Sequence, residues 1–311
     1  YLPLGLRVIE KINRIVREEM NMIGSQEVLM PALVEKKYLE ATKRWNVDIG
    51  FEVKGKKDRE PNFALGWTHE EILAAIAAKY VHSYKDLPFY AYQIQTKFRN
   101  EPRVQAGLLR GREFLMKDLY SFHASEQDLW RYYEKVKKAY FAIFKRCGLK
   151  AILTLAGGGP FTAGSTHEFQ VIADIGEDTI LVCSACNYAE NEEISKLKNG
   201  SACPKCRSRV EKKQAVEVGN IFPLGTKYSE AFGLEFRDNE GNKKPVVMGS
   251  YGLGISRLMG TIAEIHNDDK GLVWPINVSP FSAHLLELGG TAAKKLYEVL
   301  QKEGIEVLYD D

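Results

Sequence analysis

Apolar residues recur every three or four positions in several windows of this chain that contain neither glycine nor proline. In the first window, Ile9, Ile12, Val16 and Met20 fall on one face of a helix, and this face needs a partner surface to bury it. The same periodicity predicts helices over residues 6–22 and 127–146, and a third that begins at Ser256.

Two stretches, residues 89–101 and 112–122, alternate as strands do, and a polar loop separates them. One face of the first strand carries Gln93, Gln95, Lys97, Arg99 and Glu101. One face of the second carries Phe114, Met116, Asp118 and Tyr120. An antiparallel hairpin would join the two rows into one floor of charged and aromatic groups, which suits a ligand. A half-exposed sheet without a ligand is the alternative.

Shorter signals mark the boundaries of other elements. Residues 28–30 (Val-Leu-Met) predict a strand that Pro31 stops. Thr68 precedes a helical apolar pattern, and Glu71 follows three positions later, which is the signature of a capping box. Towards the C-terminal end, the pattern predicts a strand, a helix and a strand over residues 283–288, 291–303 and 305–308.

Composition excludes the unusual classes of protein. Of the 311 residues, 45% are hydrophobic and 27% charged, as in ordinary globular domains, which argues against disorder, collagen and coiled coil. The net charge of +2 means that affinity for a polyanion must come from local patches. Apolar runs are too short for a membrane helix, and no signal peptide opens the sequence, so we expect a cytoplasmic protein. The chain starts without Met, and we expect a fragment of a longer protein.

The cysteines give the strongest local signal. Two Cys-x-x-Cys pairs separated by 16 residues have the spacing of a four-thiolate zinc site. The predicted ligands are Cys183, Cys186, Cys203 and Cys206. Such a site leaves no open position on the metal and therefore serves folding. Disulfides or free thiols are the alternative. Cys147 is expected to be a buried small hydrophobe.

Four sequence motifs point to a family. The first is Phe98-Arg99-Asn100-Glu101, followed eleven residues after Arg99 by Arg110-Gly111-Arg112-Glu113-Phe114, and it resembles motif 2 of the class II aminoacyl-tRNA synthetases. The helix that ends near Pro31 resembles motif 1, and the glycine-rich segment from Gly249 to Arg257 resembles motif 3. Thr68-His69-Glu70 resembles the Thr-x-Glu signature for proline of one member family, the prolyl-tRNA synthetases of the bacterial type. The resemblance covers nearly the whole chain.

The resemblance implies an α+β fold, with an antiparallel sheet flanked by helices. It implies a catalytic domain over residues 1–278 that contains a small zinc-ribbon-like insertion at 183–213. Residues 279–311 resemble the truncated start of an α/β anticodon-binding domain. A long editing domain, which many bacterial relatives carry between motifs 2 and 3, is missing between these residues.

The resemblance also implies the roles of individual residues. Arg99 and Arg257 are the expected catalytic residues, Arg99 bridging proline and the α-phosphate and Arg257 holding the γ-phosphate. The expected ATP-binding set is Arg99, Glu101, Arg110, Gly111, Phe114, Glu217, Asn220, Gly254 and Arg257, with Glu217 also holding Mg²⁺. The expected proline-binding set is Thr68, Glu70, Arg99, Met116, Asp118, Tyr120 and Phe222.

Physical chemistry agrees with these roles. Activation brings a carboxylate to a phosphate, two anions, so the site must supply positive charge and alignment. Arg99 supplies both through its planar guanidinium. Arg257 is expected in the first turn of a helix after a glycine-rich loop, where free N–H groups favour anions.

The sequence thus predicts a ligase of protein biosynthesis. It would use ATP with Mg²⁺ to convert L-proline to prolyl-adenylate and transfer it to tRNA(Pro), as a homodimer with structural Zn²⁺ and without DNA or membrane partners. Two alternatives stay open: another class IIa synthetase or paralogue, threonyl-like, and a non-catalytic zinc-ribbon RNA-binding protein. Asn220 and Pro223 stand where the bacterial type has His and Gln.

Overall fold

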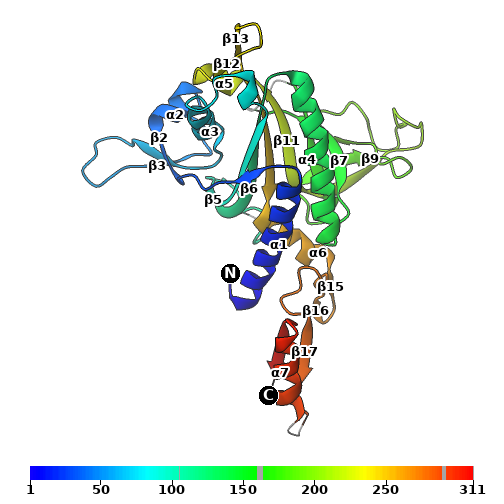
Figure 1. Cartoon of the computed structure of the whole chain (residues 1–311). Coiled ribbons are helices and arrows are strands. Elements are labelled where there is room, and N and C mark those ends of the chain that lie inside the picture. Colours follow the sequence, from blue (N-terminus) through cyan, green and yellow to red (C-terminus); the bar gives the residue numbers. More distant parts are fainter. Residues whose placement is uncertain (105, 160–163, 289–291, 311) are drawn as a thin grey trace.

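A mixed sheet of nine strands forms the centre of the molecule in the computed structural model, which describes residues 1–104, 106–159, 164–288 and 292–310. The strand order is β1-β5-β6-β14-β11-β8-β7-β10-β9 (Figure 1). The strands are β1 (Gln26–Glu27), β5 (Phe89–Phe98), β6 (Glu113–His123), β7 (Ile152–Gly157), β8 (Ser165–Ile172), β9 (Asp178–Val182), β10 (Ala189–Asn191), β11 (Glu211–Gly225) and β14 (Val247–Gly254). Neighbours are antiparallel except for β1 with β5 and β7 with β10.

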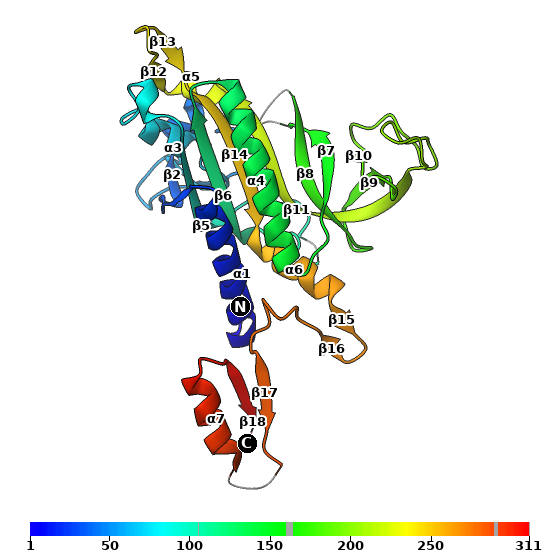
Figure 2. The same cartoon turned by 45° about the vertical axis from the view of Figure 1, so that its right-hand side comes forward.

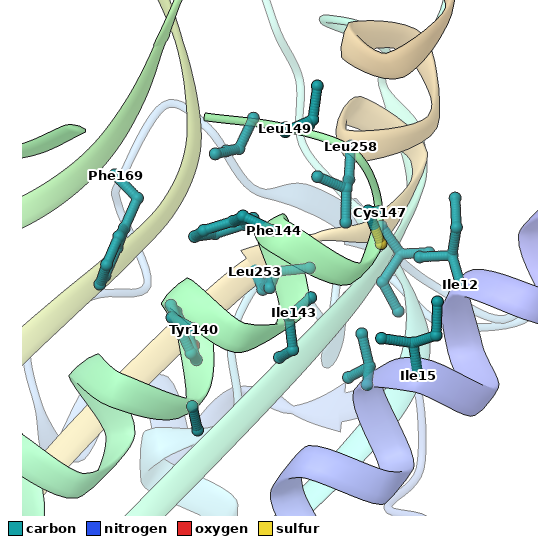
Figure 3. Close-up of a cluster of buried hydrophobic side chains, with 14 of the residues drawn as sticks. Ile12, Ile15, Tyr140, Ile143, Phe144, Cys147, Leu149, Phe169, Leu253 and Leu258 are labelled. Carbon is teal, nitrogen blue, oxygen red and sulfur yellow. The ribbon is translucent and has the colours of Figure 1, made fainter. Parts of the chain in front are cut away.

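Three helices cover one face of this sheet. They are α1 (Pro3–Met22), α4 (Glu126–Arg146) and α6 (Ile255–Ile265), with α1 and α4 side by side (Figure 2). Their apolar faces meet the sheet in one core, where Ile12 of α1, Phe144 of α4 and Leu258 of α6 are fully or almost fully buried (Figure 3). Cys147, predicted to be buried, lies in this core with no exposure.

The boundaries of two N-terminal elements differ from the prediction. The first helix starts at Pro3, because proline is favoured in the first turn, where a helix has no use for its missing N–H. The strand predicted at residues 28–30 is wrong. The paired residues are Gln26 and Glu27. Just beyond them the N–H of Val28 reaches the carbonyl of Tyr92 at 2.8 Å, and Met30 bonds to the side chain of Gln93 instead of the backbone of β5.

Smaller elements lie on the other face of the central sheet, beside β5, β6 and β14. A three-stranded sheet in the order β2-β4-β3 and a two-stranded ribbon β12-β13 flank short helices there. These elements are β2 (Leu33–Glu35), α2 (Lys36–Ala41), β3 (Phe51–Val53), β4 (Phe63–Leu65), α3 (Glu70–Ala77), a 3-10 turn (Tyr84–Asp86), α5 (Lys227–Ala231), β12 (Glu235–Arg237) and β13 (Lys243–Pro245). A second apolar cluster, which includes Tyr120, Phe122 and Tyr228, holds α3 and α5 against the sheet.

The hairpin predicted from alternation is confirmed. Strands β5 and β6 pair antiparallel, with Gln93 opposite Asp118, Gln95 opposite Met116 and Lys97 opposite Phe114. The two predicted rows therefore lie on one face of the sheet as far as Lys97. Arg99 and Glu101, predicted in the first row, lie beyond the end of β5. The other face of the same hairpin presents Tyr92, Ile94 and Leu119 to the helical layer.

The C-terminal residues form a separate small layer below the central sheet (Figures 1 and 2). Its elements are β15 (Asn267–Asp268), β16 (Gly271–Leu272), β17 (Ala283–Leu286), α7 (Ala292–Lys302) and β18 (Val307–Asp310). Strands β17 and β18 are parallel, as the predicted strand-helix-strand pattern requires. Residue 291, the predicted first residue of the helix, lies outside the described residues. Glu306 ties this layer to α1 through ion pairs with Arg7 and Lys11.

In the part of the chain that the structure describes, every helix is too short or too polar to cross a membrane.

Candidate active site

A cavity of about 250 Å³ opens on the face of the sheet opposite α1 and α4. Strands β6, β8, β11 and β14 contribute to its walls, together with the segment that follows β5, the segment before β6 and the starts of α3 and α6. All residues predicted to bind proline or ATP line this one cavity: Thr68, Glu70, Arg99, Glu101, Arg110, Gly111, Phe114, Met116, Asp118, Tyr120, Glu217, Asn220, Phe222, Gly254 and Arg257. The structure thus brings Arg99, Arg110 and Arg257 to a shared hollow from three separate segments.

Arg99 lies just beyond the end of β5 and has no anionic partner among the described residues. Its Nε atom is buried without a hydrogen-bond acceptor, and its guanidinium lies 5.3 Å from the centre of the Phe114 ring. Burial lowers the pKa of Arg99, and the nearby positive charge of Arg257 lowers it further. A buried guanidinium such as that of Arg99, with an N–H that has no acceptor, is suited to bind an anion.

The other two arginines are held by carboxylates on the rim. Arg110 donates to Glu101 at 3.1 Å and also pairs with Glu177. Arg257, the third residue of α6, donates to Glu217 at 3.0 Å and to the carbonyl of Leu109 at 2.8 Å. The positive end of the α6 dipole adds to the potential of Arg257. These pairs hold both guanidinium groups at the mouth of the cavity.

The glycine-rich segment before Arg257 is not the predicted loop. Residues 247–254 form strand β14 in the middle of the sheet, and Gly252 and Gly254 line the cavity. A Cβ atom on Gly249 would lie 2.4 Å from the hydroxyl of Tyr251 and 2.8 Å from Ser121 Oγ. The glycines therefore permit close packing and an open cavity floor, and a turn is not involved.

The capping box predicted for Thr68 and Glu71 is wrong. Helix α3 starts at Glu70, its N-cap residue is His69, and no side chain caps it. Thr68 Oγ1 instead accepts a hydrogen bond of 2.9 Å from Arg44. Glu71 also turns to Arg44, at 2.9 Å, because a buried guanidinium offers a stronger bond than a backbone N–H.

Arg44 is a residue that the sequence analysis missed. It is buried behind the cavity, 3.3 Å from Glu70 Oε2. Burial opposes its charge, but Glu70 and Glu71 together raise the pKa of Arg44. Ser250 on β14 holds the other Glu70 oxygen at 3.0 Å. Arg44 lies 24 residues before Thr68, and no local spacing connects them; Ser250 lies inside the motif 3 segment.

A group of carboxylates meets near Glu217. Glu168 of β8, also missed, lines the cavity and accepts from Asn220 Nδ2 at 3.3 Å. Burial and then the charge of Glu217 raise the pKa of Glu168 to about 8. The amide oxygen of Asn220 is buried and has no donor among the described residues. These oxygen atoms are of the type that Mg²⁺ prefers.

The four cysteines predicted as zinc ligands lie together at the end of the ribbon after β9. Their Sγ atoms are all within 4.8 Å of one another. Cys183 and Cys206 are 3.5 Å apart and Cys186 and Cys203 are 3.6 Å apart. Disulfides, with sulfurs about 2.05 Å apart, are thereby contradicted. A tetrahedron with bonds of about 2.3 Å has edges of about 3.8 Å, so the donor set fits zinc.

The two Cys-x-x-Cys turns have the same backbone geometry. In each, the N–H of the residue after the second cysteine donates 2.8 Å to the carbonyl of the first cysteine: Asn187 to Cys183 and Arg207 to Cys203. Asn187 and Arg207 both have positive φ, 55° and 65°. Such local strain is tolerated where surrounding bonds fix it.

Sheet, cavity and arginines together define the core of a class II tRNA synthetase. The family described as "tRNA synthetase class II core domain (G, H, P, S and T)" matches residues 51–266. Relatives named proline–tRNA ligase include one from Thermoanaerobacter sp. (strain X514), 32% identical over all of this chain and 82% of the relative. Another, from Sulfurimonas denitrificans, is 38% identical over all of this chain and 77% of the relative. The chain belongs to the proline–tRNA ligase family.

Solved structures agree on the fold. A prolyl-tRNA synthetase from Giardia lamblia in complex with prolyl-adenylate gives a TM-score of 0.80 at 20% identity. One from Cryptosporidium parvum complexed with L-proline and AMP gives 0.78 at 21%. The matches cover 100% and 99% of this chain, which spans 60% and 57% of the respective solved chains. The predicted fold class is thus confirmed.

The relatives also differ in length from this chain. The alignment with the Thermoanaerobacter relative extends over 468 positions, against 311 residues here, whereas the Sulfurimonas alignment extends over 337. A long part of the first relative therefore has no counterpart in this chain. That an editing domain is missing between motifs 2 and 3 stays a prediction.

Proposed function

We propose that the chain activates L-proline with ATP to prolyl-adenylate and transfers the prolyl group to tRNA(Pro). The observation that carries this proposal is the single cavity in which Arg99 and Arg257 converge above a floor that contains Glu70 and Asp118. A triphosphate and an amino-acid carboxylate need the cations, and an amino-acid ammonium needs the carboxylates. Membership of the proline–tRNA ligase family supports the same conclusion.

Two displacements make up the reaction. A carboxylate oxygen of proline attacks the α-phosphorus, a new oxygen–phosphorus bond forms, and pyrophosphate leaves with the electron pair of the broken bond. The 3′-terminal ribose hydroxyl of the tRNA then attacks the prolyl carbonyl, loses its proton and expels AMP. Arg99 binds the proline carboxylate and the α-phosphate together, which aligns them and offsets the charge that builds up between them.

The remaining nucleotide contacts follow from the cavity walls. Phe114 offers its ring to adenine, and Glu101 accepts from the adenine amino group. Arg110 and Arg257 exchange part of their present bonds to Glu101 and Glu217 for phosphate oxygens. Gly111 and Gly254 give the ligand access to the backbone.

Mg²⁺ would be held by the Glu217 carboxylate with the free amide oxygen of Asn220 beside it. When bound with the triphosphate, this ion neutralises phosphate charge. Glu168 accepts from the Asn220 amide and so keeps its oxygen available.

The proline subsite lies at the floor of the cavity. Glu70 and Asp118 face the ammonium, Thr68 contributes its hydroxyl, and Met116, Tyr120 and Phe222 enclose the ring. Arg44 and Ser250 fix the Glu70 carboxylate from behind. The floor is therefore rigid before substrate binds.

We propose the following organisation for the rest of the chain. Residues 1–278 form the catalytic domain, residues 183–213 a zinc ribbon within it, and residues 279–311 the start of an anticodon-binding domain. Motif 1 makes the chain a homodimer. We also propose that the chain acts in the cytoplasm, where ATP and tRNA are available.

Exchange of labelled pyrophosphate into ATP tests the proposed function. We expect exchange to depend on proline and to be faster with proline than with alanine, threonine or cysteine. Arg99→Ala should reduce it by a factor on the order of 100 to 1,000, as loss of a preorganised charge does. Arg131→Ala, an exposed arginine on α4, is the matched control and should leave the rate unchanged. Threonine-dependent exchange would favour the threonyl-like alternative, and no exchange together with RNA binding would favour the binding protein.

A further inference from the structure

We propose that Lys97, which does not line the cavity, is a positioning residue whose ammonium fixes Asp118 so that Asp118 Oδ1 accepts from the charged amino group of the substrate. This inference rests on the proposed function, because it concerns the amino-acid end of the same cavity. It assigns the recognition of the ammonium to a polar cluster in which Asp118 and Tyr120 line the cavity and His69, Gln93 and Lys97 do not.

The two oxygens of Asp118 have very different surroundings. Oδ2 accepts from Gln93 Nε2 at 3.0 Å, from the Tyr120 hydroxyl at 2.8 Å and from Lys97 Nζ at 3.0 Å. Oδ1 is buried and has no donor among the described residues, although Asp118 lines the cavity and is only 3% exposed. A buried acceptor without a donor is costly, so it marks the place where a ligand donor belongs.

Lys97 can hold this arrangement because all three of its protons have an acceptor. Its Nζ atom lies 2.7 Å from His69 Nδ1, 3.1 Å from Gln95 Oε1 and 3.0 Å from Asp118 Oδ2. A neutral amine has two N–H groups and would leave one acceptor unsatisfied, so the geometry requires the ammonium. The side chain has no exposure, and water cannot replace it.

The surrounding hydrogen bonds fix the orientation of each partner. His69 Nε2 lies 2.9 Å from the carbonyl of Pro31, which can only accept, so Nε2 carries the proton and Nδ1 accepts from Lys97. The backbone N–H of His69 donates 2.7 Å to the Tyr120 hydroxyl, which therefore donates onward to Asp118. No member of the cluster can turn without breaking a buried bond.

Glu70, the other carboxylate of the floor, is already engaged. One of its oxygens accepts from Ser250 and the other from Arg44. Arg44 thus holds Glu70 as Lys97 holds Asp118. Of these two carboxylates, Asp118 is the one that offers an oxygen with no donor, and the substrate ammonium can supply one.

The test uses a ligand pair that differs only at the amino group. Tetrahydrofuran-2-carboxylate has the ring and carboxylate of proline, but an ether oxygen replaces the ammonium. Its inhibition constant, divided by the KM for proline in the exchange assay, measures how strongly a variant discriminates for the ammonium. We expect Lys97→Met to lower this ratio by roughly 30- to 100-fold, the worth of a charged hydrogen bond. The KM for ATP should change less than about threefold.

Lys117→Met is the matched control. Lys117 is the neighbour of Asp118 on β6 and is also fully buried, but it faces the helical layer, where it contacts Tyr140 and the carbonyl of Tyr251 at 3.0 Å. Its loss should leave the discrimination ratio unchanged even if the thermal midpoint moves. A merely structural role of Lys97 would weaken proline, the ether analogue and ATP together and leave the ratio intact, which would overturn the proposal.

Asp118→Asn keeps the shape of the floor and tests the same idea if Lys97→Met does not fold. We expect it to lower the ratio as Lys97→Met does, and the double variant to lower it no further. An unchanged ratio in Asp118→Asn would refute the inference. Absence of proline-dependent exchange in the unaltered protein would instead refute the proposed function, so the two failures are distinguishable.

Discussion

Several single residues in this protein have chemistry that differs from that of an exposed side chain, and burial is the usual cause. His123 on β6 has no exposure, lies 2.7 Å from Asp128 and 2.9 Å from Ser121, and its pKa is lowered chiefly by burial. Cys147 shows the same effect with the opposite sign, because burial raises the pKa of its thiol to about 12. Such groups titrate outside their ordinary range, and stability therefore depends on pH.

His123 gives a prediction about acid stability. The folded-state pKa of His123 is below the ordinary value of 6.5, because the fold favours the neutral imidazole. The contribution of His123 to the free energy of unfolding is therefore fully present above pH 6.5 and is lost as the pH falls through the lowered pKa. We expect the stability advantage of the wild type over His123→Gln, measured by urea unfolding, to shrink between pH 7.5 and pH 5.5 by about 1 kcal/mol. Comparing two variants at each pH cancels the other titrating groups. An advantage that grows on acidification would show that the histidine is charged in the fold.

At the scale of elements, long-range partners overrule local signals. The Thr68 and Glu71 pattern is a good capping box by sequence, but Arg44 from another segment takes both side chains. Strand β11 is fifteen residues long and pairs in succession with β9, β8 and β14, so this one element connects the cysteine ribbon to the cavity. The ribbon itself has a small apolar cluster of Cys183, Cys203 and Val210. So small a cluster cannot fold the ribbon alone.

Metal removal should therefore unfold the ribbon alone. We expect one zinc per chain by elemental analysis, and its loss in Cys186→Ser or after chelation. Amide hydrogen exchange within residues 183–210 should then speed up, while the nine-stranded sheet stays protected and proline-dependent exchange stays within about threefold. Cys147→Ser is the control, because that thiol lies in the main core, and the variant should retain its zinc. Equal protection of the ribbon with and without metal would contradict a structural zinc.

The whole molecule divides its sheet between two tasks. One face packs against α1, α4 and α6 and supplies the main core (Figure 3), while the other holds the cavity and the second apolar cluster. Because the core is on the far face, the cavity can be lined by charged groups that a core would not tolerate. Met116 and Phe222 line the cavity, and if they enclose the proline ring as proposed, they exclude larger ligands but cannot exclude smaller ones.

Alanine should consequently be activated in error. Missing methylene groups are worth only about 1–3 kcal/mol, so we expect kcat/KM for alanine to be lower than for proline by a factor of roughly 10 to 200. We further expect alanyl-tRNA(Pro) to persist when incubated with this chain, since a long part of the Thermoanaerobacter relative has no counterpart here and an editing domain is predicted to be missing. Release of free alanine from labelled alanyl-tRNA(Pro), followed over time, checks this. Rapid release would refute it.

Much of the architecture could be predicted from the sequence because it depends on local periodicity. The helices near 6–22 and 127–146, and the two-row floor on β5 and β6, follow from side-chain direction, which the backbone fixes. Among the residues carried over by family resemblance, those on β6, β11 and β14 face the cavity for a related reason, since their positions on paired strands determine where they point. The four cysteines meet because each pair lies on one tight turn.

Other features depended on contacts between distant segments and could not be read locally. Residues 28–30 look like a strand by sequence. They leave the sheet because the backbone here bonds to side chains of other segments: the N–H of Met30 donates to Gln93, and the carbonyl of Pro31 pairs with His69. Nothing in the spacing connects Arg44 to Glu70. The two-row pattern predicted Lys97 and Asp118 on one face of a hairpin, but the contact between the Lys97 ammonium and the Asp118 carboxylate depends on the register of the paired strands. The sequence by itself determined the periodic elements and the chemical inventory, because both are properties of neighbouring residues. Only the tertiary structure decided which buried charges meet, because that depends on how separate segments pack together.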